Sequence, residues 1–134
     1  MTSTPATASS RLLWARAGAI CYIVWGFIHL QAAYAVYHLG TTLQPNMTQG
    51  RIYQDAWNLL FFGLAGIILG VTLNWRNSRW GYWINLGVIA LTDTGFIFFV
   101  LVPGYYPFWP GIDGPVFWFL GWIFLSIALP DARN

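Results

Sequence analysis

The sequence has 134 residues, of which 57% are hydrophobic, 19% aromatic and only 7% charged, and its net charge is +2. Because soluble globular domains carry about 25% charged residues, this composition excludes a soluble protein and indicates one compact integral membrane domain. The small, scattered charge argues against a nucleic-acid partner, and the single cysteine, Cys21, excludes an intrachain disulfide or a multi-cysteine metal site.

At the amino terminus, residues 1–10 are small and polar, which predicts a disordered tail before a membrane domain over residues 11–134. The next apolar segment predicts a transmembrane helix over residues 17–37. Two arginines before this segment resemble the start of a signal peptide, but its apolar run is long and contains His29. A retained helix is therefore the stronger interpretation.

The second predicted transmembrane helix, residues 56–73, follows a polar loop with glycine and proline over residues 40–54. Within this helix, Gly66 and Gly70 have the spacing that lets membrane helices approach closely. A tight turn with two arginines, residues 74–79, is then expected at a membrane surface.

Residues 80–102 predict the third helix, and a carboxyl group, Asp93, lies well inside their apolar run. About 20 residues cross the hydrocarbon core of a bilayer, so Asp93 is expected inside the membrane. A charge at that depth costs about 2.5–3.5 kcal/mol on insertion scales. Such a residue normally faces the bundle interior, is protonated or paired, and marks a site by default.

The last part of the chain begins with an aromatic segment rich in proline and glycine, residues 103–114, which predicts a headgroup-level loop or a lid over a cavity. Residues 115–129 predict the fourth helix, which is short for a membrane span. The predicted fold class is therefore all-α, a four-helix transmembrane bundle.

The arginines predict the orientation of this bundle, because positively charged residues concentrate on the cytoplasmic side. Only Arg51 falls on the opposite side from the others. We therefore expect a multi-pass protein of a bacterial inner membrane with both termini in the cytoplasm. The five arginines that predict this are Arg11, Arg16, Arg76, Arg79 and Arg133.

Three polar residues fall at middle-to-outer depth in the predicted bundle, namely His29, Asn58 and Asp93. We interpret them as candidate catalytic residues. Asp93 would act as a general acid or hold His29 in its acidic form, and Asn58 would orient the polar atom of a substrate. Candidate substrate-binding residues are Tyr34 and Asp55 nearer the outer surface, with Trp118 and Trp122 on the fourth helix.

Each candidate also has a structural interpretation. His29 and Asn58 are also typical of hydrogen bonds between membrane helices, and Asp55 suits a solvated helix start. The two tryptophans suit core packing. Asp93 is then one half of a structural pair with His29.

Three features occur in order along the chain: AWN at residues 56–58, VIALTDTGF at 88–96, and GIDGP at 111–115 before the last helix. Over residues 50–129 this order resembles the small four-helix styrene oxide isomerases. The resemblance implies a membrane trimer that isomerises aryl epoxides to aldehydes with haem as Lewis acid, and it matches Asn58 and Asp93 to two site residues. Ile52 and Tyr53 stand where that family has its haem-ligating histidine, so the cofactor has no matched ligand here.

Two classes of function follow from these features. The first is an isomerase or ring-opening enzyme that uses acid catalysis on a small lipophilic molecule from the bilayer. The second is a non-enzymatic accessory subunit or small-ligand binding protein, whose polar residues specify helix packing. A channel is less well supported, because one carboxyl group and one deep histidine make a thin ion path. In either class we expect a homo-oligomer, since four short helices bury little area on their own.

Overall fold

The computed structural model describes residues 8–129, and this part of the chain is helical and contains no strand. The prediction of an all-α chain is confirmed. Three segments, η1, η2 and η3, are π-helical turns that continue an α-helix. In chain order the elements are α1 (Ala8–Thr41), α2 (Met47–Leu69), η1 (Gly70–Asn74), α3 (Arg79–Ile84), η2 (Asn85–Ile89), α4 (Ala90–Phe96), η3 (Ile97–Leu101), α5 (Phe108–Gly111) and α6 (Asp113–Ala128).

Three stretches of helix are long and apolar enough to cross a membrane: Ala8–Thr41, Met47–Asn74 and Arg79–Leu101. Helix α6 is apolar as well, but it has only 16 residues. The helical part of the chain is thus consistent with a membrane protein. We refer to Arg79–Leu101, which comprises α3, η2, α4 and η3, as the third span.

Two helices are longer than the sequence predicts. Helix α1 begins at Ala8, so the last three residues of the predicted tail are helical, whereas residues 1–7 lie outside the described part of the chain. Helix α2 begins at Met47, which shortens the predicted loop of residues 40–54. Hydropathy marks the part of a helix that suits hydrocarbon, and it does not mark where the helix ends.

Side-chain hydrogen bonds explain the early start of α2. The Asn46 side chain accepts a hydrogen bond from the Gln49 backbone N–H at 3.1 Å and so caps the helix. The Gln49 side chain in turn donates to the carbonyl oxygens of Gly40 and Leu43, at 3.0 and 3.1 Å. These bonds close a short connection between α1 and α2.

The predicted aromatic loop is also partly helical. Helix α5 lies inside residues 103–114, and α6 begins at Asp113 rather than at residue 115. Pro115 is the third residue of α6, a position where its missing N–H leaves no helical hydrogen bond unmade.

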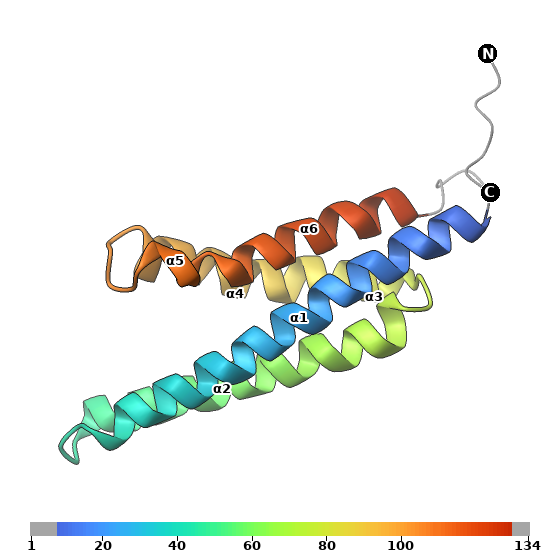
Figure 1. Ribbon diagram of the computed structural model, residues 1–134. Coiled ribbons are helices and arrows are strands. Elements are labelled where there is room, and N and C mark those ends of the chain that lie inside the picture. The colour runs from blue at the N-terminus through green and yellow to red at the C-terminus, as the bar shows by residue number, and fades with distance from the viewer. Residues whose placement is uncertain (1–7, 130–134) are drawn as a thin grey trace.

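Helix α1 is the centre of the molecule, because it packs along α2 on one side and along α6 on the other. Figure 1 shows the third span behind α6. The start of α1, the end of α6 and the connection from η1 to α3 lie together at one end, which we call the basal end. Toward the opposite, distal end, the ribbons of α1 and α2 diverge from those of α4 and α6 (Figure 1).

Glycines allow the close approach of α1 and α2. A Cβ added at Gly26 would lie 2.6 Å from the Gly63 carbonyl oxygen, and one at Gly63 would lie 2.9 Å from the Gly26 carbonyl oxygen. Gly66 faces the Trp25 ring, and Gly70 faces Ile23. The predicted glycine pair therefore packs α2 against α1 within one chain, as small residues do between membrane helices.

The third span buries every fourth residue from its start: Gly81, Asn85, Ile89 and Asp93. In an α-helix a four-residue step overshoots one turn by about 40°, so a row of such residues drifts around the helix. The wider π-helical turn η2, with its i→i+5 hydrogen bonds, takes up part of this drift. Asp93 consequently faces the core together with Asn85.

Candidate intramembrane acid site

The centre of the candidate site is a cluster of Trp25, His29 and Asp93. The Trp25 indole N–H donates a hydrogen bond to Asp93 Oδ2 at 2.9 Å. His29 lies one helical turn after Trp25, and the two rings stack with centroids 3.7 Å apart. The distance from His29 Nε2 to Asp93 Oδ1 is 3.8 Å. We call the last two residues the His29–Asp93 pair.

Three elements enclose this cluster. Trp25 and His29 come from α1, Asp93 comes from α4, and Gly114 in the first turn of α6 completes the enclosure. A Cβ added at Gly114 would lie 3.4 Å from His29 Cε1. Asp93 is only 1% exposed and His29 is 8% exposed, so the pair is buried inside the protein rather than facing the surrounding medium.

The hydrogen bonds of His29 define where its protons are. His29 Nδ1 lies 2.9 Å from the Trp25 carbonyl oxygen, and because a carbonyl only accepts, Nδ1 carries a hydrogen. The other nitrogen, Nε2, faces Asp93 Oδ1. The pair is neutral overall when it holds one further proton, either on the carboxyl group or on Nε2. Neutrality avoids an isolated buried charge, which is expensive at low dielectric.

The separation of the pair is longer than a hydrogen bond. Hydrogen bonds between such groups span about 2.7–3.2 Å, whereas Nε2 and Oδ1 are 3.8 Å apart. Asp93 Oδ1 is buried and has no hydrogen-bond partner among the described residues. Asp93 Oδ1 therefore keeps an unused acceptor position beside His29 Nε2.

The structure does not bring Asn58 to the pair. Helix α2 turns the face with Ala56 and Gly63 toward α1, and both residues are buried. Asn58 follows Ala56 by two residues, which is about 200° around the helix, and its side chain is exposed. Asp55 is exposed as well. Counting residues along the sequence gives depth in a membrane but not rotation about a helix axis.

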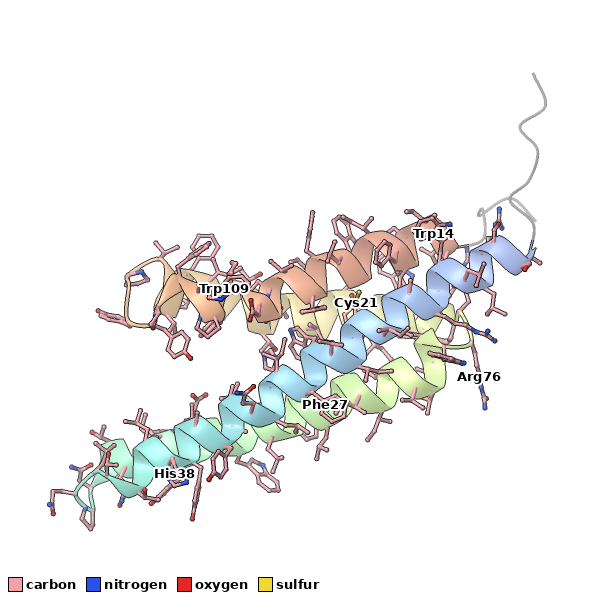
Figure 2. All side chains as sticks on the ribbon, viewed as in Figure 1. Trp14, Cys21, Phe27, His38, Arg76 and Trp109 are labelled. Atoms are coloured by element: carbon pink, nitrogen blue, oxygen red, sulfur yellow. The ribbon has the colours of Figure 1, made fainter. Side chains whose placement is uncertain are left out.

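Tyr34 also lies apart from the pair, toward the distal end of α1. Its side chain is exposed, and its hydroxyl group is 2.9 Å from His38 Nε2. At the distal end, Figure 2 shows His38 on the α1 and α2 side of the molecule and Trp109 on the α4 and α6 side. Tyr34 lines an apolar hollow of about 360 Å³ between α1 and α2, together with Ala33, Tyr37, Tyr53, Ala56, Trp57 and Leu60.

The two tryptophans of α6 have different surroundings. The Trp122 indole N–H donates to the Tyr82 hydroxyl oxygen at 3.1 Å, and this hydroxyl lies 3.2 Å from Ser126 Oγ. Trp122 thus ties α6 to α3. The Trp118 indole nitrogen is buried without a partner among the described residues. Trp118 also lines a second hollow of about 330 Å³, together with Ile97, Ile112, Pro115, Val116, Phe119 and Leu120.

On two helices, a residue that lines this second hollow closely follows a residue of the cluster or its enclosure in the sequence. Ile97, which lines it, follows Asp93 by four residues in the third span. Pro115, which also lines it, follows Gly114, the residue beside His29. Of the predicted substrate-binding residues, Trp118 therefore lines this second hollow, whereas Tyr34 lines the first.

Sequence reasoning missed the role of Trp25, which contacts both members of the pair. The available signal was a tryptophan and a histidine one turn apart in an apolar helix, because a buried indole N–H usually finds an acceptor. It also missed Asn74, which is fully buried at the end of η1.

Haem does not fit at His29. A haem iron needs a histidine nitrogen with a free lone pair. With its hydrogen on Nδ1, His29 has only Nε2 to offer, and Nε2 faces the Asp93 carboxyl group inside an enclosed cluster. His29 is 8% and Asp93 1% exposed, so the cluster leaves no room for a macrocycle. The position of the family's haem-ligating histidine holds Ile52 and Tyr53.

Comparison with protein-family models, with curated proteins and with solved structures found no significant match for this chain.

Proposed function

We propose that this chain is an enzyme of a bacterial inner membrane that isomerises or ring-opens a small lipophilic, epoxide-like molecule by acid catalysis. The observation that carries the proposal is the 3.8 Å contact between His29 Nε2 and Asp93 Oδ1 inside an apolar helical protein. Ionisable residues within membrane helices are rare because they are costly, and they commonly mark a substrate or proton site.

The proposed reaction uses only the proton of the pair. The proton moves to the epoxide oxygen, and the carbon–oxygen bond breaks with its electron pair going to oxygen. The carbon that still bears the oxygen passes a hydride to the carbon that has become cationic. A carbonyl then forms at the oxygen-bearing carbon, and the hydroxyl proton returns to the pair. Atoms and electrons balance, and the pair ends in its starting state.

The hollow beside Trp118 supports the proposal as a place for the substrate. Its volume of about 330 Å³ is at the lower end of the range typical of small-molecule pockets. Its apolar lining suits a lipophilic molecule that enters from the bilayer. Because Asp93 is 1% exposed, reaction requires the packing around the pair to open.

The test is aldehyde formation from an aryl epoxide by protein purified in detergent, with co-purifying small molecules identified by mass spectrometry. Asp93→Asn keeps the volume but removes the acid, so turnover should fall by about 100-fold. Gln31→Leu, a change at an exposed position on α1, is the control and should keep wild-type turnover. Equal turnover in wild type and Asp93→Asn would refute the proposal.

The second candidate is a non-enzymatic membrane subunit or small-ligand binder, and the closed environment of the pair favours it. Asp93 accepts a hydrogen bond from Trp25 and is covered on all sides, and Asn58 does not join it. In this case Asp93→Asn and His29→Gln act through stability. Their losses in the free energy of unfolding should then be large and non-additive in the double mutant, because contacting partners are coupled.

A further inference from the structure

The basal half of the protein contains two asparagines in an unusual environment. Asn74 and Asn85 are both 0% exposed, and neither carboxamide has a hydrogen-bond partner among the described residues. Buried polar groups in proteins are normally hydrogen-bonded, either to protein atoms or to ordered water. The described residues therefore leave both side chains without the partners that buried polar groups normally have.

These asparagines lie on a line that leads to the His29–Asp93 pair. Asn74 Oδ1 is in direct contact with the position where Gly81 would carry a Cβ, and Asn85 and Asp93 share the buried face of Gly81. Six buried side-chain polar atoms in residues 8–129 lack a partner. Five of them belong to Asn74, Asn85 and Asp93.

The spacing along this line suits water. Asn85 and Asp93 are eight residues apart, which is about 12 Å along a helix. That distance is too long for the two side chains to touch, but two or three water molecules about 2.8 Å apart would bridge most of it. Ile89, which is 2% exposed, is the buried apolar residue of this face between them, so a water file has to pass beside its side chain along the wider π-helical turn η2.

Within residues 8–129, the buried polar atoms without a partner form no comparable line on the distal side of the pair. The hollow beside Trp118 and the hollow beside Tyr34 are lined almost entirely by apolar and aromatic residues. Polar access to the pair therefore comes from the basal end, where Arg76 and Arg79 are exposed next to Asn74 and Gly81.

We propose that Asn74 and Asn85 hold a short file of water molecules that connects the basal surface with the His29–Asp93 pair and loads it with its proton. The file passes a proton from solvent water to the pair by successive hydrogen-bond transfers and needs no other reactant. The inference rests on the proposed function, because an acid site must first be protonated from solvent. It also keeps this water on the opposite side of the pair from the substrate hollow.

The experiment measures how fast the His29 ring N–H exchanges with D₂O. Protein labelled with [¹⁵N]histidine is placed in lipid nanodiscs, and the His29 signal is assigned by its loss in His29→Gln. Asn85→Leu removes one polar step of the file. Exchange should slow by about tenfold, the factor that corresponds to about 1.4 kcal/mol, within the range of one lost hydrogen bond.

Three further variants keep this test decisive. Gln31→Leu makes a similar polar-to-apolar change on the exposed face of α1 and should exchange like the wild type. Asn85→Ser retains a hydroxyl group for water and should remain within a few-fold of the wild-type rate. Asn74→Leu should slow exchange as Asn85→Leu does, and it replaces that variant if Asn85→Leu does not fold. Wild-type exchange in the leucine variants would overturn the proposal, as would equal slowing in Asn85→Ser and Asn85→Leu.

The two proposals fail in distinguishable ways. Slow exchange in Asn85→Leu together with full turnover in Asp93→Asn would retain the water file and reject the acid catalysis. Fast exchange in Asn85→Leu together with lost turnover in Asp93→Asn would retain the catalysis and reject the file.

Discussion

At the scale of single residues, Trp25 determines the geometry of the pair. Its indole N–H bonds Asp93, its ring stacks on His29, and its carbonyl oxygen accepts from His29 Nδ1. One fully buried residue thus fixes a carboxyl oxygen and a ring plane through its side chain, and a tautomer through its backbone carbonyl. A comparable arrangement orients catalytic histidines in enzymes, where a positioned partner of the imidazole fixes its proton.

Replacing Trp25 tests this role. Trp25→Phe keeps an aromatic ring over His29 but leaves Asp93 Oδ2 buried without its donor. The free energy of unfolding should fall by about 1–3 kcal/mol, the cost of an unsatisfied buried polar group. The measurement is unfolding in detergent followed by circular dichroism.

The matched control is Trp122→Phe, which also deletes an indole N–H donor. Its acceptor, the Tyr82 hydroxyl oxygen, is only partly buried and keeps Ser126 as a second neighbour. The loss should therefore be smaller than for Trp25→Phe. Equal losses in the free energy of unfolding would show that the hydrogen bond from Trp25 to Asp93 stabilises the protein no more than the one from Trp122 to Tyr82.

At the scale of elements, the contact of α1 with α2 depends on Gly26 and Gly63, where the backbones of the two helices come close to each other. Side-chain packing between membrane helices has no hydrophobic driving force against lipid, so close van der Waals contact has to supply the attraction. A methyl group at either glycine would meet the carbonyl oxygen of the other, which is backbone and has little freedom to shift.

Alanine substitutions distinguish packed glycines from exposed ones. Gly63→Ala should reduce the free energy of unfolding by about 1–3 kcal/mol through overpacking. Gly87→Ala is the control, because nothing lies within 4 Å of the added methyl group and alanine favours helix. It should be neutral or stabilising by up to about 1 kcal/mol. A loss at Gly87 equal to that at Gly63 would contradict this packing, as measured by unfolding in detergent.

At the scale of the whole molecule, the arginines are distributed unequally between the two ends. Arg16 and Arg76 lie near the basal end, where Arg16 also stacks over the Trp75 ring, whereas Arg51 follows the distal connection. This asymmetry supports our proposal of a cytoplasmic basal end. Many large apolar side chains are exposed over α2 and the third span, as expected for surfaces that face lipid or another copy.

Cysteine labelling tests the orientation in a Cys21→Ala background. An impermeant thiol reagent added from outside should reach Gln44→Cys, in the distal connection, but not Ser78→Cys, at the basal end. Both positions lie outside the long helices, so the substitutions leave the apolar packing intact. The reverse labelling pattern would place the basal end outside the cell.

Native mass spectrometry tests the assembly. We expect a homo-oligomer, and a trimer if the resemblance to styrene oxide isomerases holds. The physical reason is that the second and third spans bury only a small part of their apolar surface within one chain. A monomer across several mild detergents would contradict this expectation.

The sequence predicts the broad architecture well because apolar segments of membrane length are long and unambiguous. The all-helical class and the third span at residues 80–102 agree closely with Arg79–Leu101 in the structure. A buried carboxyl group in a helix requires a partner, which predicts His29 near Asp93, and the two side chains lie 3.8 Å apart. The position of Asn58 was not predictable, because it depends on the face that α2 turns toward α1, and that face is set by Gly63 and Gly66.

The short separation of the pair has an electrical consequence. A charge that crosses the whole hydrocarbon core, about 30 Å, does work of about 2.3 kcal/mol per 100 mV of membrane potential. The 3.8 Å between Nε2 and Oδ1 is about an eighth of that thickness, so a proton that moves between them experiences at most about 0.3 kcal/mol at 100 mV. Proton transfer within the pair should therefore proceed equally well in an energised and in a depolarised membrane.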